Sequence, residues 1–119
     1  YMLYPEAALT VARNFPGNAQ FSEKSFTGRL HEECLCDPEE FGLLMNAVAV
    51  LADHPPEDTE LNWRLFRIFS FLLAAFGHHA DPGDGFELSG LSSVAANAFK
   101  TELQEGFEGY FQNRARLGR

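Results

Sequence analysis

The pattern of apolar and polar residues predicts helices and very little strand. Between residues 37 and 53, apolar side chains cover nearly every face of a helix, which is typical of a helix buried at the centre of a bundle. Asp37 is placed to cap its N-terminus, and Pro38 suits its first position. Glu39 and Glu40 favour the positive end of the helix dipole. This segment is the clearest helix in the chain.

Three further segments carry helical periodicity. A short helix is expected within residues 5–17, where a Pro-Gly pair ends it. A longer helix is expected over residues 58–77 with Gly77 as its C-cap, and a final amphipathic helix over residues 92–117. The apolar faces of the last two helices are predicted to contain Leu61, Leu65, Ile68, Phe69, Leu72 and Phe76, then Phe99, Leu103, Phe107, Tyr110 and Phe111.

Residues 18–35 are ambiguous. Phe21, Phe26 and Leu30 follow no clean period, and Gly28 interrupts the segment. We expect a loop or a strand-like approach here, with a helical turn near residues 29–34 as an alternative for its end.

Length and composition agree with one folded domain. The chain has 119 residues, of which 45% are hydrophobic and 12 are Phe, so it can bury a core without disulfides or metals. Segments typical of strands are nearly absent. The predicted fold class is therefore all-α: a compact single-domain helical bundle of four to five helices around a central apolar helix, spanning residues 1–119. Met2 is interpreted as the natural start and Tyr1 as an addition before it.

We expect no secretory signal, because no basic segment followed by an apolar run begins the sequence. The longest central apolar run, residues 68–76, is too short to span a membrane. Cys34 and Cys36 are too close in sequence for an unstrained disulfide, and no other cysteine is present. We therefore expect a cytoplasmic protein.

Charge carries more information than any motif. The formal net charge is −8 and the pI is about 4.8, which argues against binding nucleic acid or an anionic membrane surface and favours a basic partner. Solubility alone is the alternative explanation. Between residues 30 and 63 there is no Lys or Arg, but there are nine acidic residues: Glu32, Glu33, Asp37, Glu39, Glu40, Asp53, Glu57, Asp58 and Glu60.

We predict a partner-binding acidic surface within this window. Helix capping and the helix dipole explain part of the cluster, but they do not explain Glu32 and Glu33. The predicted site consists of Glu32, Glu33, Asp37, Glu39, Glu40 and Asp58. Trp63 or Tyr110 could anchor the centre of an interface, although core packing is the preferred interpretation for Trp63.

A metal or thiol site is the competing interpretation of this stretch. His31, Cys34 and Cys36 could supply three ligands, but the C-x-C spacing and the lack of a second cysteine pair do not match zinc sites. The surrounding carboxylates should raise a thiol pKa, which disfavours a reactive thiolate. Residues 81–87, "DPGDGFE", have Gly where a calcium loop needs acids. We expect no metal, no cofactor and no enzymatic activity.

Several stretches together resemble a known family. They are "NFPGNAQFSEKSFTGRLHEECLCDPEEFGLL", "FRIFS", "DGFELSGLS" and "FEGYF". In overall pattern, from about residue 3 to residue 111, the chain is similar to bacterial immunity proteins that protect cells from polymorphic toxins, including contact-dependent growth-inhibition toxins. It differs at Gly42, where an aromatic residue is expected after "EEF". The resemblance supplies no functional residues.

The resemblance implies a small cytoplasmic protein that binds one cognate toxin domain and blocks it. Many such toxins are nucleases with basic clefts, which an acidic protein complements. Two other functions stay open: an acidic adaptor or nucleic-acid mimic that binds another basic protein, and a small metal or thiol protein. A toxin gene beside the gene for this chain would favour immunity. The sequence does not define the oligomeric state.

Overall fold

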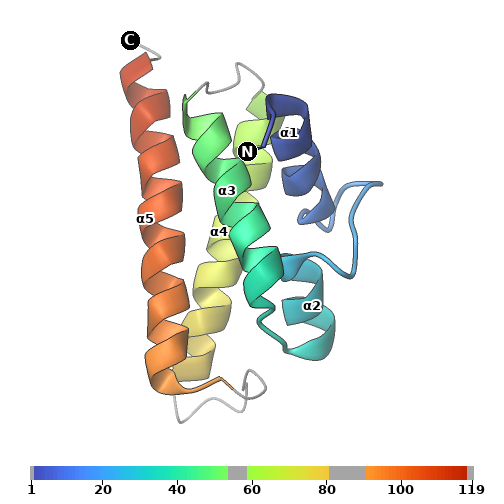
Figure 1. Ribbon diagram of the computed structural model, residues 1–119, viewed down its shortest axis with the longest axis vertical. Helices are drawn as coiled ribbons and strands as arrows, with labels where there is room; N and C mark the ends of the chain where they lie inside the picture. The colour runs from blue at the N-terminus through green and yellow to red at the C-terminus, as the bar shows by residue number, and fades with distance from the viewer. Residues whose placement is uncertain (1, 54–58, 81–90, 118–119) are drawn as a thin grey trace.

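The computed structural model describes residues 2–53, 59–80 and 91–117, and within these ranges it is helical without strands. This confirms the predicted all-α bundle. The "DPGDGFE" turn lies outside the described residues. The helices, shown in Figure 1, are α1 (Tyr4–Arg13), α2 (Phe26–Glu33), α3 (Pro38–Asp53), α4 (Thr59–Ala80) and α5 (Ser93–Leu117).

Helix α3 is the central element, as its apolar sequence predicts. It packs between α1 and α5, and α2 lies against it near its N-terminal end (Figure 1). Helix α4 lies behind α3 in this view and packs against α5 and α1. Within the described residues, no helix is both long enough and apolar enough to cross a membrane.

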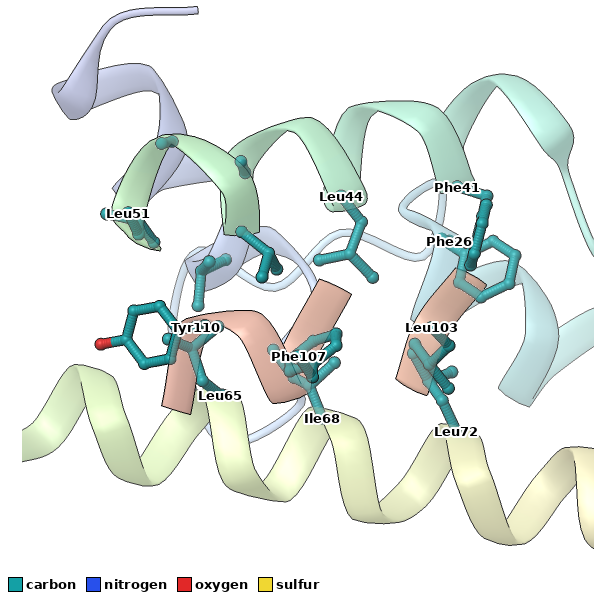
Figure 2. Packing of buried hydrophobic residues seen from close by; sticks show 14 of the residues in the cluster. Phe26, Phe41, Leu44, Leu51, Leu65, Ile68, Leu72, Leu103, Phe107 and Tyr110 are labelled. Carbon is teal, nitrogen blue, oxygen red and sulfur yellow. The ribbon is translucent and has the colours of Figure 1, made fainter. Parts of the chain in front are cut away.

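The core is formed where α3, α4 and α5 face one another (Figure 2). Residues three or four positions apart share one side of a helix, so each helix contributes one apolar stripe. The fully buried members include Leu44, Leu51, Leu65, Ile68, Leu72, Leu103, Phe107 and Tyr110. Burying each such side chain stabilises the fold by about 1.5–3 kcal/mol. The predicted core faces of α4 and α5 are thereby confirmed, with Phe69, Phe99 and Phe111 partly buried against the core.

Tyr110 brings one polar atom to the core edge. Its hydroxyl donates a hydrogen bond to Asn62 Oδ1 at 2.5 Å, which joins α5 to α4. Burial raises the pKa of Tyr110 to about 12, so the phenol stays protonated at any physiological pH. A buried ring whose hydroxyl is already paired cannot anchor a partner.

Residues 18–25 form turns and bends, in agreement with the expected loop. Residues 26–33 form helix α2, so the expectation of no more than a helical turn near residues 29–34 is wrong. Ser25 caps the helix, because its hydroxyl accepts a hydrogen bond from the Gly28 N–H at 3.0 Å. Phe26 and Leu30, one turn apart, are both buried against the core. The period was hidden because α2 has only eight residues, and it buries Thr27 and Gly28 as well as Phe26 and Leu30.

The end of α4 also differs from expectation. The helix continues past Gly77 to Ala80, so Gly77 is not its C-cap. Glycine inside a helix costs only about 1 kcal/mol relative to alanine, which a well-packed helix tolerates.

Two glycines in helices allow a matched test of packing. A Cβ at Gly28 would clash with the backbone at Ser22 and Glu23, whereas a Cβ at Gly42 meets nothing within 4 Å. Gly28→Ala should therefore lower the free energy of unfolding by more than about 2 kcal/mol, since backbone must move. Gly42→Ala should raise it by about 0.5–1 kcal/mol. Urea unfolding followed by circular dichroism measures both, and equal effects would contradict this packing.

Candidate functional site

Five of the six predicted acidic residues meet at one corner of the molecule, which we call the α2–α3 corner. Glu32 and Glu33 end α2, Asp37 precedes α3, and Glu39 and Glu40 lie in the first turn of α3. The sixth, Asp58, lies outside the described residues.

The link between the helices explains why these residues meet. Cys34 adopts a left-handed conformation, with φ of 53°. Its N–H donates to the Leu30 carbonyl at 3.1 Å, and the Leu35 N–H donates to the Arg29 carbonyl at 3.3 Å. These bonds cap the carbonyl end of α2 and reverse the chain, so α3 starts beside α2.

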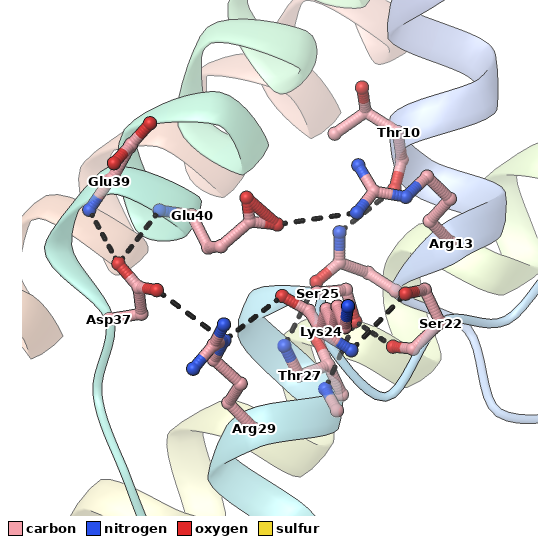
Figure 3. Close-up of polar contacts among 12 residues, drawn as sticks. Thr10, Arg13, Ser22, Lys24, Ser25, Thr27, Arg29, Asp37, Glu39 and Glu40 are labelled. Atoms are coloured by element: carbon pink, nitrogen blue, oxygen red, sulfur yellow. Dashed lines mark hydrogen bonds and ion pairs between the residues drawn. The ribbon is translucent and has the colours of Figure 1, made fainter.

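Asp37 has a structural role at this corner (Figure 3). Its Oδ1 atom accepts hydrogen bonds from the N–H groups of Glu39 at 3.0 Å and Glu40 at 3.4 Å, which confirms the predicted cap. Its Oδ2 atom lies 3.5 Å from Arg29 Nε, and Arg29 also pairs with Glu33 at 3.8 Å. One arginine of α2 therefore neutralises part of the charge on two carboxylates.

Glu40 is also used inside the fold. Its side chain is only 17% exposed, and its Oε1 atom lies 3.5 Å from Arg13 Nη2 of α1 (Figure 3). The acidic window contains no Lys or Arg in the sequence, but folding brings Arg13 and Arg29 to it from outside. The acidic surface is therefore smaller than the sequence indicates.

Glu32, Glu33 and Glu39 are the exposed carboxylates of the corner, and among these three only Glu33 pairs with an arginine of the described residues. Glu39 is exposed, and no described residue forms an ion pair with it. The Glu32 side chain is 51% exposed and lies 3.9 Å from His31 Nε2. Such an exposed pair contributes at most about 1 kcal/mol, so a partner's cation can replace it.

The thiols show no sign of a reactive centre. Cys34 and Cys36 are free, half-buried and packed against the core beside the start of α3. Burial raises the pKa of the Cys36 thiol to about 11. The direction of this shift was expected, but its cause is loss of solvation rather than the nearby carboxylates. Across the described ranges, no three His, Cys, Asp or Glu side chains are grouped as metal ligands.

An exposed aromatic surface on α4 was missed in the sequence. Trp63 and Phe66 are 53% and 49% exposed, and their rings stack with centroids 5.9 Å apart. The guanidinium of Arg67 lies 5.7 Å from the Trp63 ring centroid, and Phe71 is 37% exposed further along. We call Trp63, Phe66, Arg67 and Phe71 the α4 aromatic face. The core position preferred for Trp63 is thus wrong.

The position of the α4 aromatic face follows from helical geometry. Trp63 precedes the fully buried Leu65 by two residues, which is about 200° around a helix, so it lies on the opposite side. The face is also connected to the α2–α3 corner, because the Phe71 ring contacts His31 edge-on with centroids 5.9 Å apart. His31 directly precedes Glu32 in α2.

Comparisons with protein-family models, curated proteins and solved structures found no match to this chain.

Stability measurements can distinguish a carboxylate that stabilises the fold from one that is only exposed at the surface. Asp37→Ala removes a helix cap and an ion pair with Arg29, so the free energy of unfolding should fall by about 1–2 kcal/mol. Glu39→Ala, two residues away on an exposed position, should change it by less than about 0.5 kcal/mol. Chemical denaturation of both variants measures the difference. A loss at Glu39 equal to that at Asp37 would contradict this division.

The raised pKa of Cys36 predicts low thiol reactivity. In a Cys34→Ser variant, iodoacetamide at pH 8 should modify folded Cys36 at least about 100-fold more slowly than the unfolded chain, because its thiolate is scarce and the sulfur half-buried. Modification should accelerate as the pH rises toward 11. Mass spectrometry follows the added mass, and rapid labelling at pH 8 in native buffer would show the interpretation to be wrong.

Proposed function

We propose that this protein binds and neutralises a cognate toxin domain, in keeping with its resemblance to the polymorphic-toxin immunity proteins. The observation that carries the proposal is the α2–α3 corner, where Glu32 and Glu39 remain exposed in a chain of net charge −8. The expected toxin is a nuclease, because such an enzyme presents a basic surface to its nucleic-acid substrate. The protein would then act by covering the active site or the substrate-binding surface, without chemistry of its own.

Charge explains how such a complex could form quickly. A negatively charged protein and a basic toxin attract each other over distances of about a Debye length, roughly 8–10 Å at physiological salt, before they touch. Exposed carboxylates then pair with Lys or Arg side chains that would otherwise hold phosphates. Carboxylates already engaged with Arg13 and Arg29 contribute less, since their charge is partly compensated.

The proposal is tested with the toxin domain encoded beside the gene for this chain. Co-expression of this chain should restore growth of cells that make the toxin domain. The purified proteins should associate rapidly at low salt. Glu32→Lys/Glu39→Lys should slow association about tenfold or more at low ionic strength. The difference in association rate between this variant and the wild type should become smaller as salt is added.

A matched control separates local charge from net charge. Glu105→Lys/Glu108→Lys changes the net charge equally but lies on exposed positions of α5. Stopped-flow fluorescence should show a clearly smaller effect for this control pair. The proposal fails if the neighbouring gene encodes no toxin or if this chain does not protect the cells. The acidic-corner mechanism alone fails if the two charge-reversed pairs behave alike.

A further inference from the structure

We propose that the α4 aromatic face is the centre of the toxin-binding interface and that a hollow beside it receives one neutral side chain of the toxin. This inference rests on the proposed function and names the part of the molecule that would hold the partner. The α2–α3 corner then forms the charged rim of the same surface.

The aromatic face carries rings that the fold leaves in water. Trp63 and Phe66 are about half exposed, whereas Phe26, Phe76 and Phe107 are almost completely buried. No element among the described residues covers these two rings. Trp and Arg are the residues most often found at energetic centres of interfaces, and here Arg67 stacks over Trp63. A surface of this composition is typical of a protein-binding patch.

A hollow of about 210 Å³ lies beside this face, between α4 and the segment that joins α1 to α2. At roughly 30 Å³ for each water molecule, this volume is large enough for a side chain. Its lining is largely apolar and consists of Phe15, Pro16, Gly17, Thr27, Arg67, Ile68 and Phe71.

One buried polar atom among the lining residues lacks a partner. Thr27 is only 1% exposed, and its Oγ1 atom forms no hydrogen bond in the part of the chain that the structure describes. Its backbone N–H is fixed, because it donates to Asn14 Oδ1 at 2.9 Å. An unpaired buried hydroxyl is unfavourable, so a side chain that enters the hollow and pairs with it gains a hydrogen bond.

These contacts define the chemistry of the occupant. Phe15, Ile68 and Phe71 favour an apolar or aromatic body, and the Thr27 hydroxyl favours a hydroxyl or carbonyl at its tip. Arg67 lines the hollow and would repel Lys or Arg. Tyrosine meets all three conditions. The toxin would thus place a tyrosine or similar neutral side chain in the hollow and its basic side chains outside.

Charge complementarity identifies a basic protein as the partner. Phe71 lines the hollow and contacts His31, which precedes the exposed Glu32, so the apolar centre and the acidic rim are continuous. A basic partner gains from both regions at once, in the arrangement of apolar centre and polar rim common to interfaces. A second copy of this chain carries the same net charge of −8 and is repelled.

The test measures dissociation constants and dissociation rates of variants against the neighbouring toxin domain. Trp63→Ala should weaken binding at least about 30-fold through faster dissociation, because it removes an interface centre. Thr27→Val keeps the side-chain shape and should weaken binding about fivefold by removing the hydroxyl. Phe66→Ser is a second exposed-ring variant with the same expectation as Trp63→Ala.

Val94→Ala is the matched control. Val94 is 82% exposed and lies on α5, which is on the side of α3 away from α2 in Figure 1. It should change affinity by less than about threefold. Thermal unfolding should show that Thr27→Val is at least as stable as the wild type, because the hydroxyl it removes has no partner in the fold.

The outcomes distinguish the two proposals. If the wild-type chain does not bind the toxin domain, the proposed function fails and this inference fails with it. If the wild type binds but Trp63→Ala, Phe66→Ser and Thr27→Val bind as Val94→Ala does, the function stands and the inference is wrong. If sedimentation shows a dimer that Trp63→Ala disrupts while toxin binding is unchanged, the face joins copies of this chain and the inference is also wrong.

Discussion

The need to bury α3 is the constraint on which the rest of the structure depends. A helix with apolar side chains on almost every face must be covered from several directions, and only its ends can carry charge. α1 and α5 cover its flanks, and α2 lies near its N-terminal end. The charged residues that begin α3 are therefore brought against other helices. Arg13 and Arg29 supply the compensating charge there.

This constraint divides the acidic residues into two groups. Asp37 and Glu40 hold the start of α3 to α2 and α1, so their carboxylates are largely satisfied within the fold. Glu32, Glu33 and Glu39 are left exposed, and of these Glu33 also pairs with Arg29. The available acidic surface is small, and it lies next to aromatic rings through the contact between His31 and Phe71. An interface that combines the acidic surface with the aromatic rings supplies both rapid association, through charge, and slow dissociation, through apolar contact. Charge alone does not supply both.

The features that the sequence predicted correctly are those controlled by interactions between residues close together in the chain. The Asp-Pro-Glu-Glu stretch defined the start of α3, because capping and dipole effects act within one turn. Most of α2 was not predicted, because the need for glycine at position 28 comes from tertiary structure. The backbone of Ser22 and Glu23 lies too close to Gly28 to leave room for a side chain. The pairing of Glu40 with Arg13 joins residues 27 positions apart, so no local pattern contains it. The exposure of Trp63 was within reach, since its position relative to Leu65 places it away from the core.

The central claim is that one binding surface contains both the α4 aromatic face and the exposed carboxylates of the α2–α3 corner. Oxidative footprinting of the complex between this chain and its toxin domain tests this claim most directly. Hydroxyl radicals label exposed aromatic and histidine side chains, so Trp63, Phe66 and His31 should react in the free chain. Binding should protect these three residues strongly and leave the labelling of Val94 on α5 unchanged. Protection of Val94 with undiminished labelling of Trp63 and Phe66 would place the partner on another face and contradict this view of the molecule.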